Sequence, residues 1–211
     1  MDLRDEISKL LKKYPTLRIN QEKNCIEGYI EIGNSKSGKL GEYKINLLIP
    51  KNFPKTYPKL YEVGGKILKT PERHINYDGS CCVGVEIMIK KKYPNGISLV
   101  EYFENEIIPF FYNQIYYDYY GEWVNGDYAH YNLGILEAYY DLLKIEDKKI
   151  VITCLEKLTS KKSKMNRNEK CFCGSNLKIK KCHLKEYEEL KVIRDKKIFL
   201  RDLESIKKLD I

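Results

Sequence analysis

Long apolar runs are missing from this sequence of 211 residues. None approaches the roughly 20 uninterrupted apolar residues that a membrane-spanning helix needs. The N-terminal residues 1–6 also lack the basic start and the apolar run of a secretion signal. These absences predict a soluble cytoplasmic protein with no membrane partner.

The positive charge is confined to one part of the sequence. Residues 1–156 hold 21 basic and 22 acidic residues, residues 157–185 hold ten and one, and residues 186–211 hold seven of each. Such a break predicts two domains, residues 1–158 and residues 159–211. The basic segment is either a solvated lysine-rich linker or a surface that attracts phosphates or acidic proteins.

Seven cysteines are present, an odd number that argues against a disulfide framework in a cytoplasmic protein. Cys171, Cys173, Cys182 and His183 place four nitrogen and sulfur ligands within 13 residues. This set suits a closed tetrahedral site, which predicts structural Zn2+. Because so short a segment is too small for a core of its own, we expect metal binding to supply its folding free energy.

Residues 166–183 resemble the SEC-C zinc motif, which is appended to many bacterial proteins. The matching features are the Arg-Asn lead-in, Cys-x-Cys-Gly-Ser, the basic stretch and the closing Cys-His. The resemblance implies Cys171, Cys173, Cys182 and His183 as zinc ligands and a protein-docking role. A site with four protein ligands has no open position for a catalytic water, so we expect no catalysis there.

Apolar periodicity outlines the remaining secondary structure. Helices are expected over residues 2–13, from residue 98 with a kink or restart at Pro109, and over residues 132–143, 148–158 and 184–209. Strands are expected over residues 25–32, 43–49 and 60–63, with a hairpin loop over residues 34–41. Because strands and helices are segregated along the chain, this order predicts an α+β fold.

An irregular segment over residues 73–84 brings together chemically useful side chains. It contains His74, Asn76, Cys81 and Cys82 within nine residues. Acyl transfer needs a thiolate nucleophile and a donor for the developing oxyanion, which a cysteine and an asparagine amide can supply. Taken alone, a cysteine in such a stretch is more often a small packing residue than a nucleophile.

The same region resembles a ubiquitin-conjugating enzyme. Phe53-Pro54 and Tyr57-Pro58 follow a strand, His74-Ile75-Asn76 stands for the His-Pro-Asn motif, and residues 79–83 stand for Gly-x-Ile-Cys-Leu. The resemblance implies that family's fold, with an N-terminal helix, an antiparallel meander sheet and C-terminal helices. It also implies Cys82 as the catalytic cysteine, Asn76 as loop support or oxyanion donor, and His74 as a residue that shapes the loop.

The sequence departs from the family pattern in three respects. The proline of His-Pro-Asn is Ile75, the spacing from Asn76 to Cys82 is about two residues shorter than usual, and the tryptophan after the cysteine is missing. These departures bear on the role of Asn76 more than on that of Cys82. Cys81, next to the expected nucleophile, is either a packing residue or a redox partner.

Residues 121–140 are similar to a segment of bacterial ubiquitin-conjugating-like proteins, several of which accompany cGAS/DncV-like nucleotidyltransferases in antiphage (CBASS) operons. The resemblance implies that the conjugated partner is the C-terminus of such a nucleotidyltransferase or a ubiquitin-like protein. His130 in this segment is a candidate base or a packing residue. Because the sequence has no glycine-rich nucleotide loop, activation is expected on a separate activating enzyme.

These observations predict a thioester-forming cysteine acyltransferase that acts through Cys82. Two alternatives from other classes stay open. One is a non-catalytic docking adaptor with the same fold and the zinc motif. The other, a nucleic-acid-binding zinc protein, is disfavoured because the basic segment carries no aromatic stacking platform apart from Phe172.

Overall fold

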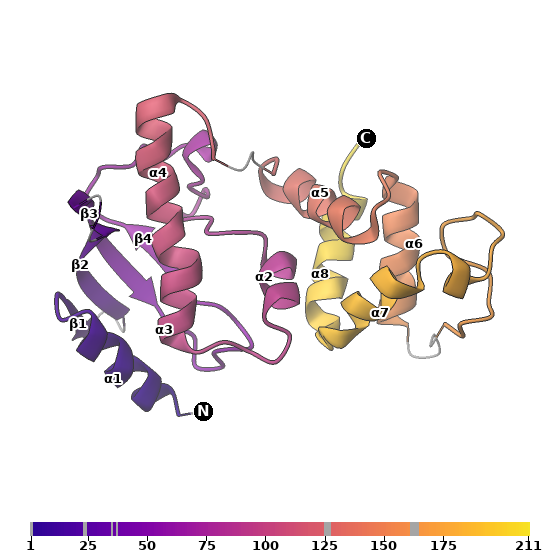
Figure 1. The fold of residues 1–211 in the computed structure, drawn as a ribbon, viewed down its shortest axis with the longest axis horizontal. Coiled ribbons are helices and arrows are strands. Elements are labelled where there is room, and N and C mark those ends of the chain that lie inside the picture. Colours follow the sequence, from indigo (N-terminus) through magenta and orange to yellow (C-terminus); the bar gives the residue numbers. More distant parts are fainter. Residues whose placement is uncertain (1, 23–24, 35, 37, 125–127, 161–164) are drawn as a thin grey trace. The chain divides into compact units, whose positions relative to one another are not determined.

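A computed structural model describes residues 2–22, 25–34, 36, 38–124, 128–160 and 165–211. The chain forms a mixed α/β structure with two compact units (Figure 1). The first unit comprises Met1–Gly84 and Gly96–Asp127, and the second comprises Val85–Asn95 and Tyr128–Ile211. Among the described helices, none combines the length and the apolar composition needed to cross a membrane.

A four-stranded antiparallel sheet forms the centre of the first unit. Its strands are β1 (Leu17–Asn20), β2 (Cys25–Asn34), β3 (Gly38–Leu48) and β4 (Lys59–Glu62), in the order β1-β2-β3-β4. The alternating residues Ile30, Ile32, Ile45 and Leu47 are buried, so the predicted strand pattern is confirmed. Strand β1 was not predicted, because Leu17 is its one buried residue.

Helices cover the sheet in the first unit. Helix α1 (Leu3–Lys13) is followed, after the sheet, by a continuous rod of α3 (Leu99–Tyr102), the π-helical turn η2 (Phe103–Ile107) and α4 (Ile108–Tyr120) (Figure 1). Pro109 lies in the first turn of α4, where a missing backbone N–H is tolerated. The predicted restart at this proline therefore follows a π-helical turn.

Aromatic contacts hold the rod against the sheet. Phe111 of α4 is fully buried and its ring centroid lies 4.5 Å from that of Tyr43 in β3. At the other end, the Tyr57 ring stacks on Tyr102 of α3 at 5.2 Å, which anchors the proline-rich chain between β3 and β4. Full burial of a ring such as that of Phe111 contributes about 1.5–3 kcal/mol. The sheet and rod thus form a rigid support for the loop that follows β4.

Helices make up most of the described part of the second unit. They are α2 (Glu86–Lys92), α5 (Tyr131–Leu143), α6 (Lys148–Thr159), the 3-10 turn η3 (Ile179–Lys181), α7 (Leu184–Val192) and α8 (Lys196–Lys207). They share one apolar core that includes Leu136, Leu155, Ile179 and Ile206. The predicted boundary at residue 158/159 therefore lies inside this unit, because helices before and after it pack on one another.

Two features of the second unit differ from the expected elements. The predicted helix over residues 184–209 is interrupted at Arg194, whose φ is 53°, and Asp195 caps α8 by accepting the N–H groups of Lys197 and Ile198. Helix α2 was not predicted. The Lys90 ammonium of α2 lies 2.9 Å from the Asp195 carboxylate, and the Glu86 carboxylate of α2 pairs with Arg201 of α8 at 2.7 Å.

Candidate functional site

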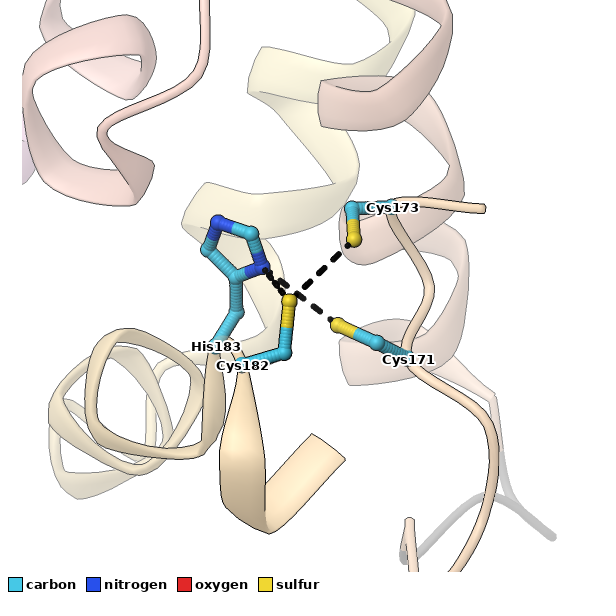
Figure 2. Close-up of side chains that lie close together, drawn as sticks. All are labelled: Cys171, Cys173, Cys182 and His183. Carbon is cyan, nitrogen blue, oxygen red and sulfur yellow. Dashed lines mark hydrogen bonds between the residues drawn. The ribbon is translucent and has the colours of Figure 1, made fainter. Parts of the chain in front are cut away.

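Three cysteines and a histidine converge in the second unit. The ligand atoms of Cys171, Cys173, Cys182 and His183 all lie within 4.8 Å of one another, and Figure 2 shows the sulfurs and the imidazole pointing toward one centre. The Cys182 sulfur lies 3.0 Å from His183 Nδ1 and 3.5 Å from the Cys173 sulfur. The Cys171 sulfur lies 3.4 Å from the same His183 nitrogen.

Local backbone structure brings these ligands together. A short antiparallel bridge between Lys170 and Lys178 closes the first cysteine pair into a hairpin, in which the Cys171 N–H donates to the Leu177 carbonyl at 2.8 Å. Gly174 turns the chain with φ 78°, a conformation that favours glycine. Cys182 ends the turn η3, and His183 then stands at the N-terminus of α7.

The geometry of this donor set fits zinc. A tetrahedral ion bound at about 2.3 Å from each sulfur requires sulfur–sulfur distances of about 3.8 Å. The Cys173–Cys182 sulfur–sulfur distance of 3.5 Å is close to that value, and all four ligand atoms lie within 4.8 Å of one another. Three soft thiolates and one imidazole are the ligands that structural zinc prefers, so these four residues could hold the ion.

Surroundings shift the pKa values of two of the thiols in opposite directions. Burial raises the pKa of Cys171 to about 11. Burial also acts to raise the pKa of Cys173, but hydrogen bonds from Ser175 and from the other two cysteines outweigh it and lower the value to about 6. A thiolate is therefore available at Cys173 near neutral pH, which is the form that binds metals.

The cysteine segment does not stand apart from the rest of the second unit. Ile179 is fully buried, Phe172 is 7% exposed, and both belong to the core that α5–α8 form. The Phe172 ring also lies 6.2 Å from that of Tyr187 in α7. The segment has no core of its own, as expected, but it shares the core of the second unit, so apolar burial also contributes to its folding free energy.

Comparison with protein families identifies this segment. Residues 167–185 match the SEC-C motif. The SEC-C segment, as we call these residues below, contains all four converging ligands. Comparisons of the chain with curated proteins and with solved structures find no match.

The second cluster of interest lies on the loop after β4, in the first unit. Residues 74–76 and 80–82 run antiparallel around a bridge between Ile75 and Cys81. The Cys82 N–H donates to the His74 carbonyl at 2.7 Å, and the Asn76 N–H donates to the Ser80 carbonyl at 2.8 Å. A turn at Gly79, with φ 78°, closes this small hairpin, which we call the cysteine hairpin.

The two adjacent cysteines face different surroundings. The Cys81 N–H donates to the Leu60 carbonyl of β4, on the opposite side of the chain from the bond that Cys82 makes to His74. Side chains alternate in such an arrangement, and accordingly Cys81 is buried whereas Cys82 is half-buried. Burial raises the pKa of Cys81 to about 12, so this thiol is a poor nucleophile. Of the pair, Cys82 is the thiol that reaches solvent.

Asn76 belongs to a polar chain at the tip of the cysteine hairpin. Its Nδ2 lies 3.0 Å from Ser80 Oγ, which lies 2.5 Å from Asp78 Oδ1. Asp78 Oδ2 in turn accepts from Lys59 Nζ at 2.9 Å. The Lys59 ammonium and the Ser80 donors lower the pKa of Asp78 to about 2, so this carboxylate is ionised at neutral pH.

His74 lies against an aromatic group at the end of α4. Its ring packs edge-on against Trp123 at 4.5 Å, and Trp123 lies 4.8 Å from Tyr117. The Arg73 guanidinium covers the Tyr117 ring at 4.8 Å. These contacts support His74 in a left-handed conformation, φ 53°, from which its carbonyl accepts the Cys82 N–H.

The predicted catalytic residues fall in different units. His74, Asn76 and Cys82 share the cysteine hairpin, whereas His130 precedes α5 in the second unit, with its ring 6.3 Å from Tyr131. Residues 125–127 of the segment that suggested His130 lie outside the described residues. Sequence reasoning missed Asp78 and Ser80, although Asp-Gly-Ser is typical of a turn in which an aspartate side chain accepts a backbone N–H.

Proposed function

We propose that the chain is a ubiquitin-conjugating-like cysteine acyltransferase in which Cys82 carries the acyl group. The observation that supports this most is the placement of the two cysteines: Cys82 is half-buried, on the same face of the cysteine hairpin as Asn76, whereas Cys81 is buried on the opposite face. The order of α1, the four-stranded meander and then the cysteine hairpin also agrees with the fold that the sequence resemblance implies.

The proposed reaction has two balanced steps. The Cys82 thiolate attacks the carbonyl carbon of an incoming thioester, a new carbon–sulfur bond forms, and the donor thiolate leaves. An acceptor amine then attacks the Cys82 thioester, loses a proton to solvent, and releases the Cys82 thiolate. Because the first step exchanges one thioester for another, it is close to isoenergetic, and Asn76 would donate to the oxyanion of each tetrahedral intermediate.

The partners are proposed from the resemblance at residues 121–140. The acyl group would be the C-terminus of a cGAS/DncV-like nucleotidyltransferase in antiphage defence, or of a ubiquitin-like protein, delivered by a separate activating enzyme. The SEC-C segment would then dock a protein partner, with Zn2+ as a structural ion. Cytoplasmic location is part of the same proposal.

Mass spectrometry of the intact full-length protein tests the proposal. The probes are thioesters of two C-terminal peptides, one from a nucleotidyltransferase of the proposed kind and one from a ubiquitin-like protein. We expect an adduct that dithiothreitol removes, that Cys82→Ala abolishes, and that Cys82→Ser converts into a dithiothreitol-resistant ester. Cys81→Ala is the matched control and should retain the adduct. An undiminished adduct in Cys82→Ala would refute the thioester role.

A docking adaptor is the second candidate, and the match to the SEC-C motif favours it. In that case the full-length protein would form no adduct with either peptide thioester. It would still bind the nucleotidyltransferase or the ubiquitin-like protein from which the peptides derive. Substituting Cys171 by Ser should then weaken binding, whereas Cys82→Ala should not. Isothermal titration calorimetry with the two parent proteins separates these outcomes.

A further inference from the structure

We infer that Asp78 and Ser80 are positioning residues that fix the orientation of the Asn76 amide, on the face of the cysteine hairpin that also carries Cys82. The inference rests on the proposed acyltransferase function. The polar chain from Lys59 through Asp78 and Ser80 to Asn76 carries it. In each hydrogen bond of this chain, only one of the two groups can be the donor. Together these assignments determine whether the NH2 or the carbonyl of the Asn76 amide faces Ser80.

The argument begins at the carboxylate. An ionised aspartate can only accept hydrogen bonds, and Asp78 accepts from Lys59 Nζ, from the Ser80 N–H at 3.0 Å and from the Ser80 hydroxyl. The single hydroxyl hydrogen of Ser80 is therefore committed to Asp78. Toward Asn76, Ser80 Oγ can offer only a lone pair, so the group of Asn76 that faces it must be the NH2 and not the carbonyl.

This orientation matters for the proposed chemistry. An amide NH2 has two hydrogens, and Ser80 engages one of them at 3.0 Å. The second remains on the same nitrogen, held in a fixed plane instead of rotating. Ser80 is 5% exposed, so water cannot easily replace it in this role. A preorganised donor stabilises an oxyanion without reorganisation at the moment of reaction, whereas a flipped amide would present a repelling oxygen.

A double-mutant cycle tests the inference with the same peptide thioesters and a small amine as acceptor. Ser80→Ala should leave loading of Cys82 detectable and slow transfer to the amine about tenfold, the value of one hydrogen bond of about 1.4 kcal/mol. In an Asn76→Ala background, Ser80→Ala should cause no further loss, because its effect passes through Asn76. Asp78→Ala, which removes the acceptor of the Ser80 hydroxyl, should behave like Ser80→Ala, and Asp78→Glu should restore part of the rate.

Ser98→Ala is the matched control, because Ser98 Oγ also donates to a carboxylate, that of Glu101 at 2.7 Å, at the start of α3. It should leave the transfer rate unchanged. Equal losses from Ser80→Ala with and without Asn76 would overturn the inference, since they would indicate a general effect on the fold. Absence of any adduct on Cys82 in the unsubstituted protein would instead overturn the proposed function itself.

Discussion

Single polar side chains hold critical positions in the first unit. Glu6 of α1 is 3% exposed, and its carboxylate accepts the Leu99 N–H at 2.8 Å and pairs with Lys9 at 2.9 Å. It thereby joins α1 to the start of α3. Its position could not be predicted from sequence, because Leu99 is 93 residues away and no local pattern marks the pairing.

Removing this carboxylate should destabilise the first unit. Glu6→Ala leaves the buried Leu99 N–H without its acceptor, so we expect a loss of about 1–3 kcal/mol in the free energy of unfolding. Lys9→Ala, which removes a largely exposed partner, should cost much less. Urea denaturation of both variants checks the difference, and equal midpoints for the two would contradict this assignment.

Acidification should act on the same contact. Burial tends to raise the pKa of Glu6, but the Leu99 N–H and Lys9 outweigh it, and the folded-state pKa lies below the ordinary value. A carboxyl with a lowered pKa stabilises the fold above its unfolded-state pKa of about 4.3, and this contribution is lost as pH falls through the folded-state value. Stability measured from pH 6 to pH 3 should therefore fall less steeply in Glu6→Gln than in the unsubstituted protein. Equal pH dependence of stability in the two proteins would contradict the lowered pKa of Glu6.

At the scale of elements, sequence periodicity was informative wherever one face of a long element is buried. Strands β2 and β3, and helices α1, α5 and α6, were predicted on this basis. Strand β1 was missed because Leu17 is its one buried residue, and α2 was missed because its seven residues carry little helical periodicity; β4, equally short, was predicted. The candidate catalytic residues could be named from motifs, but the hydrogen bonds between Arg73, next to His74, and α4 could not, because α4 is distant in sequence.

Gln114 of α4 provides the clearest such support. It is fully buried, its Nε2 donates to the Arg73 carbonyl at 2.8 Å, and its Oε1 accepts from Arg73 Nε at 2.9 Å. Gln114→Ala should therefore loosen the cysteine hairpin. We expect hydrogen exchange at the Cys82 N–H to accelerate about tenfold, the effect of losing about 1.4 kcal/mol of local stability. Tyr119→Ala, at an exposed residue of α4, is the control and should leave the exchange rate of the Cys82 N–H unchanged. An unchanged exchange rate in Gln114→Ala would contradict the prediction.

At the scale of the whole molecule, composition and structure divide the chain differently. The charge break suggested that the zinc segment is an appendage, but core packing places it with α5–α8 and with α2. Charge describes a surface, whereas the boundary of a compact unit depends on which apolar side chains meet. Only the contacts between apolar side chains could have identified residues 85–95 as part of the second unit.

Zinc should therefore stabilise the second unit rather than fold a separate tail. We expect one Zn2+ per chain by elemental analysis, and a lower unfolding midpoint after chelation, with helical circular dichroism largely retained below that midpoint. Cys171→Ser should reduce zinc content, whereas Cys154→Ala, at a buried cysteine outside the four ligands, should not. Complete loss of the helical signal on chelation would contradict the claim that the apolar core stabilises the second unit in addition to zinc.

The central claim concerns one sulfur atom, and peptide mapping of the trapped adduct tests it most directly. The unsubstituted full-length protein would be loaded with a peptide thioester, quenched in acid, digested, and analysed by tandem mass spectrometry. The account predicts acyl mass on Cys82, none on the adjacent buried Cys81, and none on the three cysteines of the SEC-C segment. Acyl mass on any of those four cysteines in place of Cys82, or on none of the seven, would contradict it.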